Sequence, residues 1–215
     1  MKRILILLTM TLIVLGMAVA EVSAISDAET AANDILNKNH TDSKVLVVYF
    51  SRTGENYNVG NVNVDVGNTA MVASYIKEYL KADSFEIVPI DKYPEKYDEC
   101  TEVAQKEKDD NARPNIQGKI NNFDSYDTVF IGYPIWWGDL PMIMYTFMEE
   151  YDFNGKNVIP FNTHEGSGDA GTYQSIQSKL PNAKVNTKGL ALDGKTARSD
   201  DGKQQTIDWL KGLGY

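Results

Sequence analysis

The sequence of 215 residues contains little that would build a covalent or metal-bound scaffold. Its one cysteine, Cys100, excludes an internal disulfide and leaves no cysteine pair for a metal site. The two histidines, His40 and His164, lie far apart and lack ligand spacing, so a structural zinc is not expected. We interpret Cys100 as a helix residue without a special role, with an intermolecular disulfide as the alternative.

Basic residues are also scarce, because 21 lysines and arginines stand against 30 aspartates and glutamates, and the formal net charge is −9. Nucleic acid is therefore not an expected partner, since binding phosphates over a surface requires a basic patch. An acidic surface instead favours basic partners or simple solubility. Hydrophobic residues make up 42% of the chain, enough for the core of one α/β domain plus a short appendage.

The longest apolar run lies at the N-terminus. Residues 1–24 have the pattern of an export signal, with Lys2 and Arg3 before the apolar stretch Ile4–Ala20 and small residues at the cleavage spacing. We expect an exported, extracytoplasmic protein. It is either secreted after cleavage or tethered to the membrane by this segment, which is near the lower length limit for a span. Residues 25–43 are polar and alanine-rich, and we interpret them as a linker.

The rest of the chain is organised around Val45–Gly54, which reads VLVVYFSRTG. Its first six residues, Val45–Phe50, predict a strand buried on both faces. Hydroxyl side chains and a glycine follow directly, and a helical pattern resumes at Asn68. A strand, a turn and a helix N-terminus in this order favour phosphate binding, because hydroxyls and free backbone N–H groups face the anion. Neither a Walker motif nor a dinucleotide-binding motif is present here.

Strand-like runs alternate with helical patterns through the remaining sequence, and a charged helix with a solvated face is expected at Asp98–Asp110. This alternation predicts an α/β fold with a parallel sheet and helices on both faces. Pro89 predicts that the second strand lies at a sheet edge. The expected strands are Lys44–Phe50, Phe85–Ile90, Asp127–Tyr133, Lys156–Phe161 and Lys184–Leu192, and the other expected helices are Asn68–Ala82, Asp139–Tyr151, Gly171–Leu180 and Ser199–Leu213.

Four motifs in this order resemble the flavodoxin-like family: FSRTG at Phe50–Gly54, GNT at Gly67–Thr69, GYPIWWGDLP at Gly132–Pro141 and FNTHEGSG at Phe161–Gly168. The resemblance runs from about residue 44 to the C-terminus. It implies a flavodoxin-like domain at 44–215, with a doubly wound five-stranded parallel sheet in the order 2-1-3-4-5. It also implies noncovalent flavin mononucleotide (FMN) beyond the carboxyl ends of the strands.

The resemblance implies that three loops form the FMN site. The first would bind the phosphate, with Arg52 either neutralising it or facing solvent. In the second, one tryptophan would stack on the isoalloxazine ring while the other packs. The third would bring backbone N–H groups and His164 to the pyrimidine edge. The residues expected to bind FMN are Ser51, Arg52, Thr53, Gly54, Asn68, Thr69, Pro134, Ile135, Trp136, Trp137, Gly138, Thr163, His164, Glu165, Gly166 and Gly168.

Residues Glu55–Gly67 read as an insertion, because in the simplest flavodoxin-like pattern the phosphate turn runs directly into Asn-Thr. Valines spaced partly by twos and a turn at Gly60-Asn61 predict a hairpin. Two interpretations stay open for it, namely a surface flap and a lid over the phosphate or ribityl chain.

The implied function is that of a redox protein that carries electrons or hydride through FMN to a partner protein, with no catalytic side chain and no metal ligand. One alternative is an FMN-dependent NAD(P)H or quinone oxidoreductase, a type that often has a homo-oligomer interface. The other is a non-redox binding module that has lost the flavin because the insertion splits its phosphate loop. The fold by itself does not decide among these.

Overall fold

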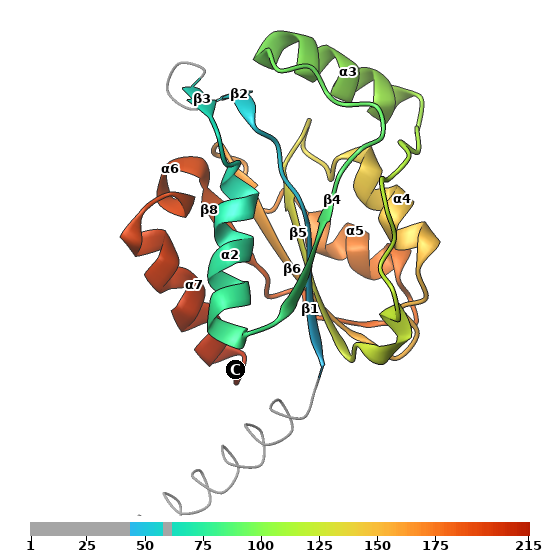
Figure 1. The fold of residues 1–215 in the computed structure, drawn as a ribbon, viewed down its shortest axis with the longest axis vertical. Helices are drawn as coiled ribbons and strands as arrows, with labels where there is room; N and C mark the ends of the chain where they lie inside the picture. Colours follow the sequence, from blue (N-terminus) through green and yellow to red (C-terminus); the bar gives the residue numbers. More distant parts are fainter. Residues whose placement is uncertain (1–43, 58–61) are drawn as a thin grey trace, which may run out of the picture. The chain divides into compact units, whose positions relative to one another are not determined.

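The computed structural model describes residues 44–57 and 62–215 (Figure 1). The expected export segment 1–24, the linker 25–43 and the expected hairpin turn at Gly60-Asn61 lie outside the described residues. Within the described ranges, no helix combines the length and hydrophobicity needed to cross a membrane.

A parallel sheet forms the centre of the domain. Strand β1 (Val45–Phe50) lies between β4 (Asp83–Ile87) and β5 (Thr128–Pro134), and β6 (Asn157–His164) follows β5. The next position is filled by β7 (Lys184–Val185) and β8 (Leu190–Asp193), which both pair with β6 in parallel. The order β4-β1-β5-β6-β7 confirms the predicted order 2-1-3-4-5, and β4 lies at an edge as predicted.

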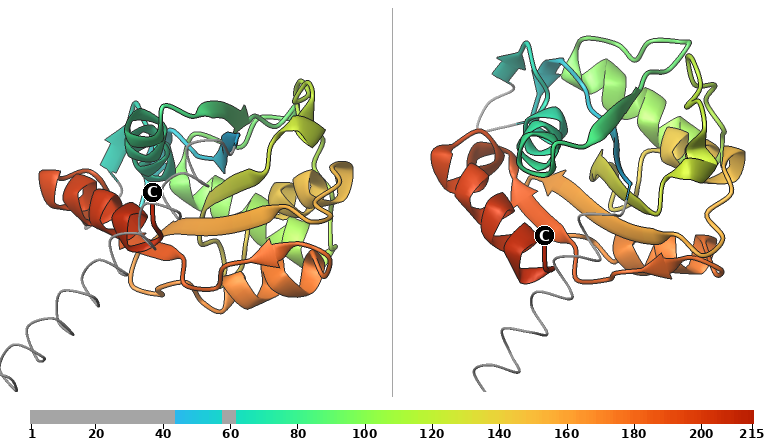
Figure 2. Two further views of the ribbon diagram at one scale, coloured as in Figure 1. Left: turned by 90° about the horizontal axis from the view of Figure 1, so that it is seen from below. Right: turned by 60° about the horizontal axis from the view of Figure 1, so that its bottom comes forward.

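The apolar run of β1 is buried because helices cover both faces of the sheet. Leu46, Val47, Val48 and Phe50 are all buried. Figures 1 and 2 show α2 (Asn68–Leu80), α6 (Gly194–Ala197) and α7 (Asp200–Gly212) on one face, with α4 (Met142–Glu150) and α5 (Thr172–Lys179) on the other. A 3₁₀ turn, η1 (Phe123–Ser125), precedes β5.

Helix α4 begins three residues later than the pattern predicted. Pro141 is its N-cap, with φ −55° and ψ 140°, rather than a residue of its first turn. Helix α2 has Gly67 as its N-cap, without a capping side chain of its own. Its buried residues Val72, Ala73 and Ile76 recur at helical spacing and face the sheet.

The fifth strand, predicted as one run from Lys184 to Leu192, is interrupted by residues 186–189. The break lies beside Pro160 of β6, which has no N–H to donate to a neighbouring strand. Gly189 passes so close to Pro160 that a Cβ at this glycine would lie 2.5 Å from the proline carbonyl oxygen. A continuous ladder is therefore replaced by two short strands.

The insertion forms the predicted hairpin in its described part. Strands β2 (Gly54–Asn56) and β3 (Val62–Val64) pair antiparallel. Beside this hairpin stands α3 (Tyr97–Asp109), which contacts β2 and α4. Figure 1 shows α3 beyond the carboxyl ends of the strands, clear of the sheet. Helix α3, in the crossover after β4, therefore lies over the carboxyl ends of the strands, where the three predicted loops meet.

Candidate functional site

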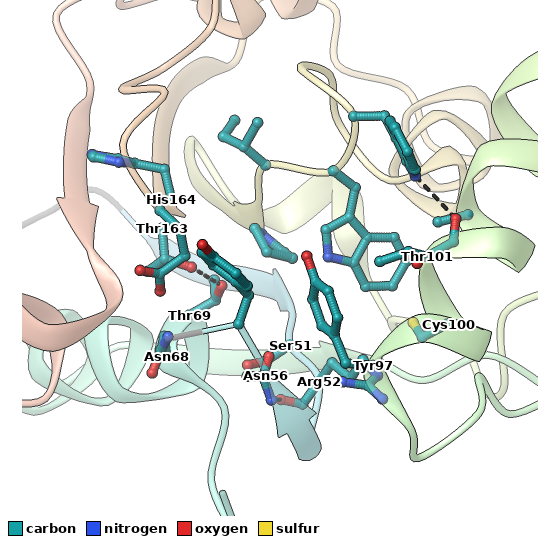
Figure 3. Close-up of a pocket in the computed structure, with 17 residues that line it drawn as sticks. Ser51, Arg52, Asn56, Asn68, Thr69, Tyr97, Cys100, Thr101, Thr163 and His164 are labelled. Atoms are coloured by element: carbon teal, nitrogen blue, oxygen red, sulfur yellow. Dashed lines mark hydrogen bonds between the residues drawn. The ribbon is translucent and has the colours of Figure 1, made fainter. Parts of the chain in front are cut away.

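A cavity of about 400 Å³ lies at the carboxyl ends of β1, β5 and β6 (Figure 3). It brings together residues from all three predicted loops. The predicted residues that line it are Ser51, Arg52, Asn68, Thr69, Pro134, Ile135, Trp136, Trp137, Thr163, His164 and Glu165. Figure 3 shows Asn68, Thr69, Thr163 and His164 on one side, with Cys100 and Thr101 on the other.

Five other predicted residues do not line the cavity. Thr53 is exposed. The glycines at 54, 138, 166 and 168 have positive φ and shape the loops instead. At Gly54, with φ +84°, a Cβ would also come within 2.9 Å of the Glu95 carbonyl oxygen, so the turn requires glycine.

One end of the cavity is polar and lies at the N-terminus of α2. The Ser51 hydroxyl accepts a hydrogen bond from the Ala70 N–H at 3.1 Å, and so caps the helix from a distant point in the sequence. Gly67 packs into this turn so tightly that a Cβ would lie 2.3 Å from Ser51 Oγ and 2.4 Å from the Arg52 carbonyl oxygen. The turn at Ser51 and Arg52 therefore contacts the start of α2, although residues 55–67 are inserted between them.

Two buried threonines connect the first and third loops. The Thr69 and Thr163 hydroxyls are 2.8 Å apart. The third loop is held from behind by Asn162, whose Nδ2 donates to the Gly168 carbonyl oxygen at 3.0 Å. The Tyr173 hydroxyl in turn donates to Asn162 Oδ1. These hydrogen bonds fix the third loop at the end of β6.

The other end of the cavity is aromatic, and its two tryptophans have different environments. Trp136 is half-buried and packs edge-to-face on Phe50 and Tyr93, with ring centroids 5.3 and 5.0 Å away. Trp137 remains 54% exposed, and its indole N–H donates to the Thr101 carbonyl oxygen at 3.0 Å. The Lys108 ammonium donates to the Trp137 carbonyl oxygen at 2.6 Å. One tryptophan packs, as expected for one of the pair, while the other stands at the cavity mouth.

Arg52 lines the cavity and does not extend into solvent, which was one of its two predicted environments. Its guanidinium donates to the Pro94 and Glu95 carbonyl oxygens at 2.6 Å, and also to the Glu55 carbonyl oxygen. The third nitrogen of the guanidinium, Nε, is buried and has no hydrogen-bond partner among the described residues. The Arg52 head group therefore ties the hairpin to the segment before α3 instead of extending into solvent.

Six lining residues were not predicted, namely Asn56, Tyr57, Tyr97, Cys100, Thr101 and Ala104. Four of them lie on one face of α3, at helical spacing. Their signal was weak because that helix is rich in charge, which is typical of a solvated face. Cys100 is a helix residue, as interpreted, but it is buried and lines the cavity.

The flavodoxin family model matches residues 44–211 of the chain. The chain belongs to the flavodoxin family. A protein from Bacteroides eggerthii, assigned as a flavoprotein, is 30% identical, with a TM-score of 0.65 over 81% of this chain and 99% of that one. A second protein assigned as a flavoprotein, from Bacteroides uniformis, is 31% identical. Its TM-score is 0.64, and the match covers 79% of this chain and 98% of that one.

A flavoprotein from Lactobacillus acidophilus, solved in complex with FMN, shares the fold of this flavodoxin-family chain. It is 21% identical, with a TM-score of 0.56 over 71% of this chain and 95% of that one. No curated protein matches the chain significantly.

Two ionisable residues at the third loop have distinct surroundings in this flavodoxin-family chain. His164 Nδ1 accepts a hydrogen bond from the Gly166 N–H at 3.0 Å, so a neutral ring carries its proton on Nε2. Partial burial of the neighbouring Glu165 carboxyl, and then the charge of Asp193, raise the pKa of Glu165. The Asp193 pKa is lowered, chiefly because that carboxylate accepts from the Thr196 hydroxyl.

We expect Glu165→Gln to change how stability depends on pH. Because the folded pKa of Glu165 is raised, protonation of this residue stabilises the fold below its ordinary pKa. This stabilisation is lost as the pH rises through the folded value. The variant removes that loss, so its stability relative to wild type should increase from acid to neutral pH. Urea unfolding at several pH values measures this. An unchanged difference in stability between the variant and wild type at every pH would contradict the assignment.

Proposed function

We propose that this flavodoxin-family protein binds FMN noncovalently and serves as a redox protein through it. The observation that carries the proposal is the division of the cavity into two unlike ends. Hydroxyls, an amide and a helix N-terminus form one end, and two tryptophans with Pro134 and Ile135 form the other. A phosphate suits the first end and a flat, partly apolar ring suits the second.

The residues present fit FMN on two further observations. The Gly67 cradle holds the backbone of the phosphate turn against α2, and a side chain at this position would fill it. The buried Arg52 Nε lacks a partner in the described chain while Arg52 lines the cavity, so an anion there would find an unused donor. Ser51, Asn68, Thr69 and Arg52 would hold the phosphate. Trp136, Trp137 and the 163–165 loop would surround the ring.

FMN, when bound, supplies the transfer of one or two electrons. The chain itself supplies binding, orientation and polarity. Its polar end places donors at the N-terminus of a 13-residue helix, whose dipole favours negative charge. Its apolar end would exclude water from the flavin ring. The surroundings of the ring then determine how strongly negative charge on the reduced flavin is stabilised.

The position of the insertion supports a retained flavin site. The hypothesis of a lost flavin rested on residues 55–67 splitting the phosphate loop. The inserted segment leaves the turn as the β2–β3 hairpin, while Ser51 still bonds to the Ala70 N–H. The hairpin adds Asn56 and Tyr57 to the cavity wall without separating the parts of the polar end. The Lactobacillus acidophilus flavoprotein of this fold, solved with FMN, supports the same proposal.

Titration of FMN into the apoprotein tests the proposal. We expect saturable one-to-one binding with quenched flavin fluorescence. Thr69→Val keeps the side-chain shape and removes a hydroxyl, and should weaken binding roughly tenfold, as for one lost hydrogen bond to a charged group. Thr187→Val, on the connection between β7 and β8, is the matched control and should bind as wild type does. Absence of binding at high micromolar FMN would reject the redox function in all its forms.

A further inference from the structure

Arg198 lies behind the polar end of the cavity, where α6 ends. Its Nη1 group donates to the Val66 carbonyl oxygen at 2.6 Å and to Asn68 Oδ1 at 3.3 Å. Arg198 is exposed, and it is not among the described residues that line the cavity. Asn68 does line the cavity, at the start of α2. Arg198 therefore contacts a cavity residue from outside the cavity.

An arginine holds the insertion at each of its two bases. At the first base, Arg52 donates to the Glu55 carbonyl oxygen. At the second base, Arg198 donates to the carbonyl oxygen of Val66, the residue before Gly67. Gly67 is the residue that packs tightly against the turn after β1. The Arg198 contact therefore fixes the point at which the chain returns from the hairpin to α2.

The hydrogen bond from Arg198 also determines how the Asn68 amide is oriented. A guanidinium only donates, whereas an asparagine amide has an oxygen that accepts and a nitrogen that donates. The bond therefore places Oδ1 on the Arg198 side and leaves Nδ2 on the other. A Cβ on Gly194 would lie 2.3 Å from Asn68 Nδ2 and 2.2 Å from Glu165 Oε1. The amide nitrogen thus lies on the side of a carboxyl group, which favours the same orientation.

An amide held in this orientation suits an anion. Asn68 Nδ2 carries two N–H groups, so one remains for a ligand even when the Glu165 carboxylate accepts the other. Donation from a charged guanidinium to Oδ1 also polarises the amide, which makes its N–H groups stronger donors. In the opposite orientation, Oδ1 would face the anion and repel it.

We propose that Arg198 is a positioning residue for the phosphate group of the ligand and that it acts through Asn68. The inference rests on the proposed FMN function and extends it to a residue outside the cavity. Riboflavin has the same ring and ribityl chain as FMN but lacks the phosphate. Because the oriented amide meets only the phosphate, Arg198 contributes to the binding of FMN and not to that of riboflavin.

Titrations of the apoprotein with FMN and with riboflavin, followed by flavin fluorescence, test the inference. Arg198→Met should weaken FMN binding roughly fivefold, as for one lost hydrogen bond, and should leave riboflavin affinity within about twofold. Arg198→Lys keeps the charge and a donor, and should recover part of the loss. Unchanged FMN affinity in Arg198→Met, or an equal loss for both ligands, would overturn the inference.

The matched control is Lys195→Met. Lys195 is an exposed cation of the same short helix, three residues before Arg198. Its removal changes the net charge by the same amount, so both flavins should bind as they do to wild type. A loss of FMN affinity equal to that of Arg198→Met would show that net charge, and not the orientation of the amide, is responsible.

A double-mutant cycle shows whether Arg198 acts through Asn68. In an Asn68→Ala background no amide is left to orient, so Arg198→Met should change FMN affinity by less than about twofold. The full loss in that background would mean that Arg198 acts on the ligand directly, which contradicts the proposal.

Asn68→Asp tests the role of the amide nitrogen. The new carboxylate still accepts from Arg198, but it cannot donate to a phosphate and adds a negative charge. FMN affinity should therefore fall by more than about tenfold, with riboflavin affinity little changed and with folding checked by circular dichroism. FMN affinity as in wild type would show that Nδ2 does not face the phosphate, and the inference would fail.

The outcomes separate this inference from the proposed function. A wild-type protein that binds no FMN would reject the proposed function before any variant is made. A wild-type protein that binds FMN, together with an Arg198→Met variant that binds it equally well, would reject only the positioning role of Arg198.

Discussion

Gly67→Ala is expected to weaken FMN binding by roughly 100-fold, equivalent to about 3 kcal/mol. The new Cβ would lie 2.3 Å from Ser51 Oγ and 2.4 Å from the Arg52 carbonyl oxygen, so the phosphate turn must move away from α2. The backbone of Gly67, with φ −68°, suits alanine. The effect therefore comes from the clash and not from conformational strain. Titration of the apoprotein with FMN measures the loss of affinity.

Gly212→Ala is the matched control for this substitution. Gly212 ends α7, and a Cβ there would meet no atom within 4 Å. Alanine has the higher helix propensity, so this variant should be as stable as wild type or slightly more so, with unchanged FMN affinity. Gly67→Ala with near-normal affinity would mean that the turn between β1 and α2 does not hold the phosphate.

Arg52→Ala is expected to lower the free energy of unfolding by about 2–3 kcal/mol, because three carbonyl oxygens lose a charged donor. The hairpin and the start of α3 should loosen together, since Arg52 joins them. Chemical unfolding gives the stability change, and amide hydrogen exchange should accelerate at residues 54–56 and 95–97. Lys211→Ala removes a cation from an exposed ion pair with Asp208 and should cost less than about 1 kcal/mol.

Arg52→Lys distinguishes the two roles that this arginine can have. A lysine keeps the positive charge but lacks the planar fork that reaches several carbonyl oxygens at once. If Arg52 mainly ties the hairpin to the segment before α3, Arg52→Lys should resemble Arg52→Ala in stability and in hydrogen exchange. If charge at the phosphate dominates, Arg52→Lys should resemble wild type in both, with only FMN affinity affected in Arg52→Ala.

Local patterns predicted most of the sheet. The β1 run is so uniformly apolar that only a strand covered on both faces accommodates it, and Leu46, Val47 and Val48 are buried accordingly. Pro89 placed its strand at an edge, and the spaced valines predicted the hairpin, both from short-range chemistry. The interruption beside Pro160 was not predicted, because it depends on a neighbouring strand that pairs with β6 across the sheet.

The site was predicted less completely than the sheet. Residues that follow directly on a strand end, such as Ser51, Trp136 and His164, reach the cavity because the carboxyl ends of parallel strands meet at one edge. The glycines of these loops shape the backbone from outside the cavity. The cavity-lining residues of α3 were not predicted, because the charged sequence of a helix does not indicate where the helix packs in the fold.

The alternation of strands and helices, the family and the loops that converge at the sheet edge could be predicted, because each depends on residues that are close neighbours in the chain. The environments of Arg52 and Trp137 depend instead on tertiary contacts. The partners of these two residues are 42 and 36 positions away in the chain, at Pro94 and Thr101. Contacts between such distant segments arise when the crossover after β4 carries α3 over the cavity. No periodicity within either segment encodes that position.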